Sequence, residues 1–198
     1  MLICFLFFNM RLGILCLFFI LTLLSCNEYT PRPKGYQRVV RQPVEYLEFS
    51  NKDFSFLYPN DTYIESLISQ TKSETWFSLH YKQYNATLHC TYIPLSNQDL
   101  NKILDDSYQL AYGHVSMAQG ISQTQFSDSL HQTFGIIYDI QGAVASPVQF
   151  YVTDNTTNFL RGSLYFDQIA RADSVAPVVS SIRKDIVYIM ESLKWKNR

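Results

Sequence analysis

The first 25 residues limit how much of this chain can fold as a globular domain, because they carry the pattern of a leader that is removed. Leu12–Leu24 is an apolar run interrupted by one glycine and one threonine, Arg11 gives it a positive start, and Ser25 stands directly before Cys26. This is the layout of a secretory signal peptide. The ending Leu-Leu-Ser-Cys is typical of a lipobox, at which a diacylglyceryl group joins the sulfur of Cys26 and residues 1–25 are cut off.

Two alternative interpretations of this segment stay open. The first is a retained membrane anchor, but the apolar run is 13 residues long, whereas a membrane span needs roughly 20. Asn9 and Arg11 also separate the run from the apolar residues before it. The second is cleavage without lipid, which leaves Cys26 unexplained. A start at Met10 would give a shorter leader and would make residues 1–9 an upstream extension.

The mature chain that we expect, Cys26–Arg198, has 173 residues, which suits one domain. A domain of this size can bury about 70% of its unfolded surface, so it needs no metal or disulfide to fold. Besides Cys26 the mature part holds only Cys90, so no internal disulfide is predicted. Its 15 basic and 17 acidic residues give no electrostatic basis for binding nucleic acid.

Residues 26–45 are predicted to be a lipidated cysteine followed by an extended tether, and residues 46–198 to be the globular domain. Prolines at positions 31 and 33 favour a polyproline-like backbone, which spaces a domain away from a membrane. Stable anchoring needs more than one acyl chain, of which we expect palmitate to be one. The basic side chains of the tether either lie against anionic headgroups or are solvated: Arg32, Lys34, Arg38 and Arg41.

The first half of the domain reads as strands followed by a helix. Phe54–Tyr58 ends at a proline and is typical of a strand. Trp76–Tyr81 and Ala86–Ile93 are predicted to form a hairpin around residues 82–85, with Phe77, Leu79 and Tyr81 on the same face as Leu88, Cys90 and Tyr92. A helix is expected next, with Ser96 as its N-cap, Gly113 as its stop and a buried stripe of Leu100, Ile103, Leu104, Tyr108, Ala111 and Val115.

The second half is richer in strands. Residues 121–126, 132–140, 143–153 and 159–166 are candidates, and the last three form a predicted antiparallel meander. Pro147 suggests an edge position or a bulge. A final helix is expected from Ser174, with Pro177 in its first turn, with Lys194 and Lys196 near its end, and with a buried stripe of Val179, Ile182, Ile186, Ile189, Met190 and Leu193.

This order of elements predicts an α+β fold: an antiparallel sheet of about six strands with two main helices packed on it. The helices do not alternate with single strands, as a repeating βαβ pattern would require.

The residues carry no recognisable catalytic constellation. With Leu79 opposite Cys90, His80 and His89 would lie side by side on the other face of the hairpin, but two imidazoles are too few for a stable metal site, and a solvent-facing pair is the alternative. Cys90 in mid-strand behaves as a small hydrophobe. Because there is no nucleophile elbow, P-loop or dinucleotide-binding glycine pattern, we expect no catalytic residue, no metal and no cofactor.

Several segments of the mature chain resemble the gliding motility lipoprotein GldD family. The resemblance covers essentially all of the mature chain and is carried by Thr30–Tyr36, Asp106–His114, Tyr138–Ser146, Gln149–Phe150, Thr153–Asp154, Phe159–Phe166 and Glu191–Trp195. The first nine residues lie outside the usual leader pattern of the family, which favours a start at Met10. The order of elements is also similar to that of the Mog1/PsbP-type fold.

The resemblance implies a non-enzymatic, lipid-anchored protein of the cell envelope. Such a protein is required for gliding motility and for the associated type IX protein secretion machinery, whose envelope proteins would be its partners. We expect it to attach to the membrane through Cys26 and to face the periplasm. The sequence does not indicate which membrane holds the lipid.

Within the same family pattern, Arg161 and Gly162 are the candidate partner-binding residues. Glycine permits close backbone approach, and arginine is enriched at binding hot spots. The alternative for Arg161 is an internal ion pair with Asp139 or Asp154.

Two other functions stay open beside this one. A periplasmic small-ligand-binding lipoprotein is suggested by the 14 tyrosines and 14 phenylalanines, although these equally suit a core. A hydrolase with an unrecognised Ser/His pair has weaker support.

Overall fold

The computed structural model of the chain describes residues 41, 43–68, 73–95, 99–113, 115–167 and 172–196. The leader, Cys26 and nearly all of the proposed tether lie outside the described residues. The described residues belong to a compact unit, Tyr36–Arg198.

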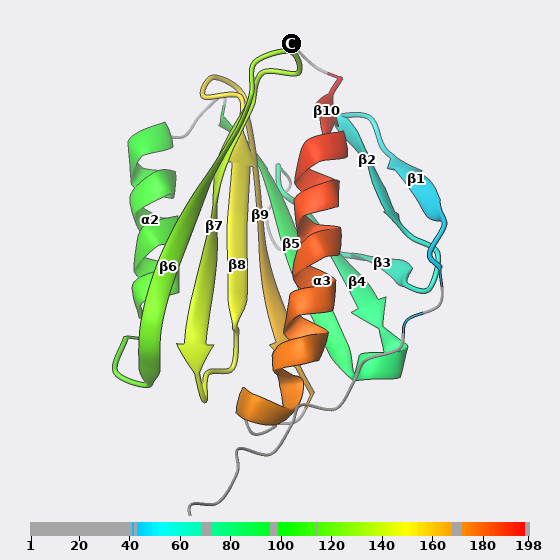
Figure 1. Ribbon diagram of the computed structural model, residues 1–198. Coiled ribbons are helices and arrows are strands. Elements are labelled where there is room, and N and C mark those ends of the chain that lie inside the picture. The colour runs from blue at the N-terminus through cyan, green and yellow to red at the C-terminus, as the bar shows by residue number, and fades with distance from the viewer. Residues whose placement is uncertain are drawn as a thin grey trace, which may run out of the picture. The chain divides into compact units, whose positions relative to one another are not determined.

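Seven antiparallel strands form the main sheet, in the order β3-β4-β5-β9-β8-β7-β6 (Figure 1). Their bounds are β3 Tyr63–Leu67, β4 Thr75–Tyr81, β5 Ala86–Pro94, β6 Ala118–Asp128, β7 Thr133–Gly142, β8 Val148–Thr153 and β9 Asn158–Phe166. A second, three-stranded sheet has the order β1-β2-β10, with β1 Tyr46–Ser50, β2 Phe54–Pro59 and β10 Lys194–Trp195. The helices are α2 Leu100–Tyr112, α3 Ala172–Ser192 and the short 3-10 helix η1 Lys82–Tyr84.

This architecture confirms the predicted α+β class, with antiparallel sheets and two main helices. The described part of the main sheet has seven strands where about six were expected, because β3 was missed. The predicted strand Phe54–Tyr58 forms as β2 but belongs to the second sheet. β3 carries a glutamate and a serine and is largely exposed, so it lacks a clear hydrophobic alternation. The meander of β7, β8 and β9 is confirmed, since each strand pairs antiparallel with the next.

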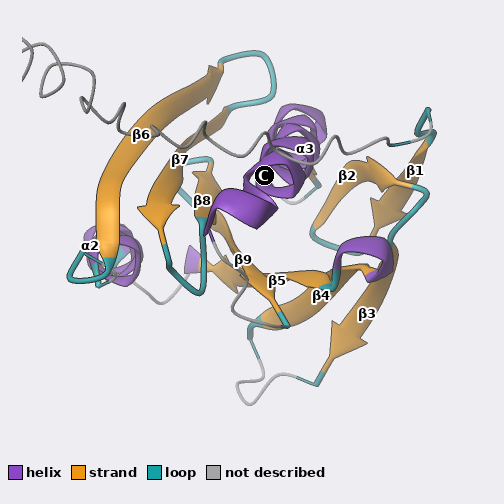
Figure 2. Cartoon of the chain, turned by 60° about the horizontal axis from the view of Figure 1, so that its bottom comes forward, coloured by secondary structure: helices purple, strands orange, loops and turns teal. Residues whose placement is uncertain are grey.

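The main core lies on one face of the large sheet, beneath α3 and the small sheet (Figure 2). Ile182, Ile186 and Ile189 of α3 are almost completely buried there, in the same cluster as Phe54 and Phe56 of β2. α2 lies on the opposite face. Its small core joins Ile103 to residues of β5 and β9 and of the loop after β5: Ile93, Phe159 and Leu95.

The β4–β5 hairpin forms with the predicted faces but with a different register. Leu79 pairs with Leu88, and not with Cys90 as expected. The connection between the strands sets this register. η1 is followed by Asn85 in the left-handed region (φ 48°), and this turn brings Tyr81 opposite Ala86. Each later pair of the hairpin follows from that first pair. The two histidines therefore share a face, but neither is the direct partner of the other.

The start of α2 differs from the prediction. Asp99 is the N-cap, and its carboxylate accepts a hydrogen bond from the Asn101 N–H at 2.9 Å, so the assignment of Ser96 was wrong. The chain still follows the sheet at Leu95, whose N–H bonds the Thr157 carbonyl, which delays the helix. Gly113 does cap the helix end. Tyr108 and Val115 of the predicted stripe are exposed, and Val115 lies beyond the helix.

Two proline assignments and the end of α3 also need correction. β8 begins directly after Pro147 and is an interior strand, whereas an edge position or a bulge was expected. Because the proline precedes the strand, its missing N–H removes no hydrogen bond between β8 and its neighbours. α3 starts at Ala172, which puts Pro177 in its second turn. Lys194 belongs to β10 and Lys196 donates to Ser50 Oγ and the Asn51 carbonyl, so these lysines hold the small sheet and do not cap the helix.

Candidate functional site

One face of the main sheet is only partly covered by the described residues. We call the outer face the side of β3, β4, β5 and β9 that points away from α3. In Figure 2, α2 lies beside β6 and β7, away from β3 and β4. Strand pairing places on this face Tyr63, Glu65, Trp76, Ser78, His80, Thr87, His89, Thr91, Arg161, Ser163 and Tyr165.

The two histidines of the outer face are held by their neighbours. His89 Nδ1 lies 2.9 Å from Ser78 Oγ, and His80 lies 3.0 Å from Glu65 and 3.2 Å from Thr87 Oγ1. Burial and the nearby His80 lower the pKa of His89. Within the described ranges, no three histidine, cysteine or acidic side chains are grouped as a metal site would require.

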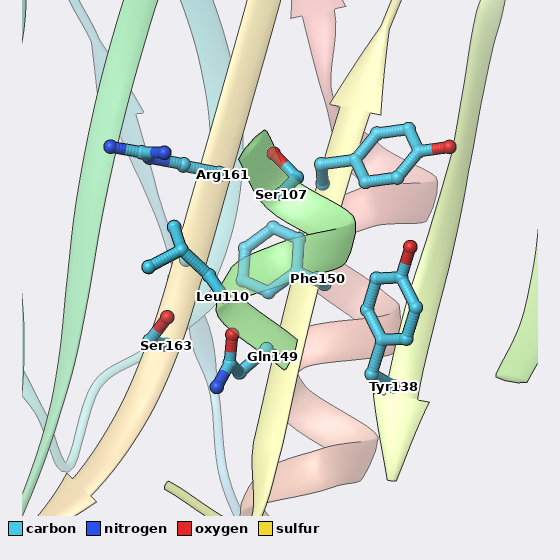
Figure 3. Close-up of a pocket in the computed structure, with 9 residues that line it drawn as sticks. Ser107, Leu110, Tyr138, Gln149, Phe150, Arg161 and Ser163 are labelled. Carbon is cyan, nitrogen blue, oxygen red and sulfur yellow. The ribbon is translucent and has the colours of Figure 1, made fainter. Parts of the chain in front are cut away.

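A small depression opens between α2 and the sheet, beside the outer face (Figure 3). Its free volume is about 10 Å³, which is about the space of one water molecule. It is lined by Ser107 and Leu110 of α2 together with Tyr138, Gln149, Phe150, Tyr151, Arg161, Gly162 and Ser163 of the sheet. In Figure 3, Arg161 extends from β9 toward the side opposite Tyr138.

Polar groups at this depression lack partners among the described residues. Ser107 is 7% exposed, and its buried Oγ has no hydrogen-bond partner. Gln149 is 6% exposed. Arg161 is half-buried, and no described carboxylate forms an ion pair with it. The sequence pattern suggested Arg161 but gave no signal for Ser107 and Gln149, because only the packing of α2 on the sheet brings these residues to one depression.

The two aspartates considered as partners for Arg161 are engaged elsewhere. Asp139 accepts two hydrogen bonds from the guanidinium of Arg183, at 2.6 and 2.9 Å. Asp154 accepts the N–H groups of Thr156, Thr157 and Asn158 in the turn between β8 and β9. Burial opposes ionisation of Asp154, but these donors outweigh it and lower its pKa to about 2.

Gly162 makes room for an aromatic ring of the main core. A Cβ atom at this position would lie 2.3 Å from Cε1 of Phe150. The glycine therefore lets the ring pack directly against the β9 backbone, next to the strand position that carries Arg161.

A partly buried ionic cluster joins the start of the described chain to α3. It corrects the expectation that Arg41 lies against headgroups or is solvated, because Arg41 binds two aspartates of the domain. The Arg41 guanidinium binds Asp61 through two hydrogen bonds of 2.8 and 2.6 Å and Asp185 through one of 2.7 Å. Asp185 is 2% exposed, and burial raises its pKa although Arg41 opposes this. The one feature of the sequence that could have indicated this cluster is Asp185, an acidic residue next to Ile186 in the predicted apolar stripe of α3.

Cys90 is unsuited to nucleophilic chemistry. Its side chain is buried in the main core, and burial raises the pKa of its thiol well above the ordinary value.

Fold and site together define an antiparallel α+β domain with a partly uncovered sheet face, which carries an arginine that has no carboxylate partner among the described residues. Residues 26–195 match the family described as gliding motility lipoprotein GldD, and the chain belongs to this family. It is therefore a gliding motility lipoprotein associated with the cell envelope. No helix of the described residues has both the length and the apolarity to cross a bilayer.

Two other comparisons complete this result. The search of curated proteins gives no match. Among solved structures, the solution structure of cyanobacterial PsbP (CyanoP) from Synechocystis sp. PCC 6803 is similar, with a TM-score of 0.48 and 9% identity, over 88% of this chain and 99% of that chain.

Proposed function

We propose that this chain is a lipid-anchored, non-catalytic accessory protein required for gliding motility and for the associated type IX protein secretion machinery. The observation that carries the proposal is the family match, which begins at residue 26, the lipobox cysteine. In this proposal Cys26 bears the lipid after removal of residues 1–25, residues 26–45 are the tether, and residues 46–198 are a periplasm-facing domain that contacts envelope partners.

The state of the reactive side chains supports a non-catalytic role. Cys90 is buried with a raised thiol pKa. His80 and His89 are hydrogen-bonded to side chains of the neighbouring strands. Ser78 and His89 lie within hydrogen-bond distance, as a nucleophile and its base would, but Ser78 is 1% exposed, so its hydroxyl is not accessible to a substrate.

The depression beside α2 gives no support to the small-ligand alternative. Pockets for small molecules usually measure about 300–1,000 Å³, whereas this depression has a free volume of about 10 Å³. Contact with a protein partner near Arg161 and Gly162 fits the site better, because such a contact needs a flat, partly polar surface with an anchoring side chain.

A crosslinking pull-down from envelopes tests the proposal. The full chain with a C-terminal tag would be compared with Cys26→Ala, and Cys16→Ala would serve as the matched control, because Cys16 is a leader cysteine outside the lipobox. We expect gliding and secretion proteins to co-purify with the wild type and with Cys16→Ala, but not with Cys26→Ala. Normal gliding and secretion in a deletion strain would overturn the proposal.

A further inference from the structure

β6 is an edge strand that lacks the features which normally protect the edge of a sheet. It has 11 residues and pairs with β7 along one side only, and Figure 2 shows it at one margin of the main sheet. Neither a charged residue nor a proline occurs from Ala118 to Ser127. Natural edge strands are usually short, charged or interrupted by proline, because an open edge pairs readily with another strand.

The other edges of the two sheets, as far as the structure describes them, carry such protection. β1 and β3 have five residues each and β10 has two. Each of these strands also presents an exposed charge: Glu48 on β1, Glu65 on β3 and Lys194 on β10. The long neutral edge is therefore a property of β6 alone among the described edge strands.

The sequence of β6 suits antiparallel pairing with an identical strand. Gln123 is the middle residue of β6, so a pairing centred on it aligns the whole strand with its copy. Phe126 then lies opposite Gly120 of the second copy, and Thr124 lies opposite Ser122. Aromatic rings can cover a glycine across a strand pair, and paired hydroxyl side chains also stabilise a sheet.

The one charge of β6 does not oppose this pairing. Asp128 ends the strand and lies opposite Ala118 of the second copy in the register centred on the middle residue. At about 3.4 Å per residue the two aspartates are roughly 34 Å apart. This separation is several times the screening length of about 8 Å at physiological ionic strength, so the two charges do not repel each other appreciably.

Exposed apolar side chains stand at both ends of β6 and complement one another in such a pair. Leu130, just after the strand, is 81% exposed, and Met117, just before it, is 65% exposed. Antiparallel pairing brings the end of one β6 beside the start of the other. Leu130 of each copy would therefore come near Met117 of the other, and two-fold symmetry repeats this contact at both ends. Its burial would favour association.

The same symmetry is compatible with attachment of both copies to one membrane. Thr124 lies 3.4 Å from Arg183 of α3, whereas Gln123 donates to Tyr112 of α2 at 2.9 Å, so successive side chains of β6 point to opposite faces. A two-fold axis perpendicular to the sheet keeps the α3 helices of both copies on one side. Arg41 is bound to α3. Both proposed tethers would therefore leave the joined sheet on that side.

We propose that β6 pairs in antiparallel with β6 of a second copy of this chain, in the register centred on Gln123, and joins two main sheets into one. A second copy is the occupant because the neutral strand and the apolar residues at its ends complement themselves. The inference goes beyond the proposed function and does not depend on it. Only the shared direction of the tethers uses the proposed lipid.

Charge substitution at the symmetry axis tests the pairing. Gln123→Lys and Gln123→Glu each place two like charges opposite one another, whereas a mixture of the two variants places opposite charges there. Light scattering after size-exclusion chromatography measures the mass of the full lipidated chain in detergent. We expect a dimer for the wild type, a dissociation constant raised about tenfold or more in each variant, and recovery of the dimer in the mixture.

The matched control is Ser66→Lys, which introduces a charge at an exposed position of the β3 edge and should leave the mass unchanged. Gln123 is exposed, so melting temperatures close to that of the wild type are expected and would show that each variant folds.

Disulfide formation in envelopes gives a second readout. Residues opposite one another in an antiparallel pair have Cα atoms about 4.5–5.5 Å apart, which a disulfide can bridge. Gln123→Cys should therefore form a linked dimer of the full chain. Gln125→Cys alone should not, but it should link to Ile121→Cys when the two are expressed together. Cys90 is buried and does not compete.

Three outcomes would overturn the proposal. The first is a Gln123→Cys chain that stays unlinked in envelopes, whatever its mass in detergent. The second is a dimer that neither charge weakens, since another surface would then hold the copies together. The third is a link from Gln123→Cys to a different protein, which would show that the edge receives a partner's strand. Gliding and secretion in a deletion strain test the proposed function separately from all three.

Discussion

Arg41 makes contacts with residues that lie far away along the chain. Its guanidinium joins Asp61, 20 residues away, to Asp185, 144 residues away on α3. A carboxylate as buried as that of Asp185 is tolerated because the guanidinium neutralises it and satisfies its oxygen. Arg41 lies 15 residues after Cys26, so the cluster would also fix where the proposed tether meets the domain.

We expect Arg41→Ala to lower the free energy of unfolding by about 3–5 kcal/mol, because it leaves Asp185 buried without its cation. Urea denaturation of the full chain in detergent measures this. Arg183→Ala is the matched control, since it removes an ion pair nearer the surface, and such pairs contribute about 0–1 kcal/mol. Equal losses in the two variants would contradict the assigned role of the buried cluster.

Asp154 should make the stability of the protein depend on pH in acid. Its pKa lies at about 2 in the folded chain, below its ordinary value of 3.8, so the ionised carboxylate favours the folded state. This contribution is complete above about pH 4 and is lost as the pH falls toward 2. Thermal unfolding between pH 5 and 2 should show a smaller decline in Asp154→Asn than in the wild type, and parallel curves would refute the assignment.

At the scale of elements, the close packing of β8 on β9 depends on a position without a side chain. Gly162 allows the Phe150 ring to rest against β9. The same strand carries Arg161, so the placement of this candidate partner-binding residue depends on the contact.

Gly162→Ala should cost about 1–3 kcal/mol of stability, because the added methyl group overlaps the Phe150 ring. Gly120→Ala is the matched control, since a Cβ there would meet its nearest atom at 3.8 Å. Chemical denaturation compares the two variants. Phe150→Leu in the Gly162→Ala background should recover part of the loss, whereas a wild-type stability for Gly162→Ala would show that the ring relaxes freely.

At the scale of the whole molecule, membrane attachment through a lipid on Cys26 should be independent of the folding of the described domain. Cys26 lies outside the described residues, and the main core and the ionic cluster are built from residues 41–196. The lipid would therefore determine where the protein resides without determining whether its domain folds.

Cys26→Ala should move the protein from the membrane fraction to the soluble fraction and leave its melting temperature unchanged, because the lipid supplies membrane affinity. Fractionation of envelopes followed by thermal unfolding measures both properties. Cys90→Ala should remain membrane-bound. Membrane retention of Cys26→Ala would favour the anchor formed by an uncleaved apolar segment.

The sequence by itself determined the α+β class, the alternation that buries Phe77, Leu79 and Tyr81, and the buried isoleucines of α3. Each of these depends on a period of two or 3.6 residues that can be read within one segment. Tertiary structure alone decided the partner of Arg41, the register of the β4–β5 hairpin and the pairing of β10 with β2. It also brought Ser107 of α2 to Arg161 of β9. Contacts between distant segments depend on how the chain closes around its core, and no local pattern of residues records that closure.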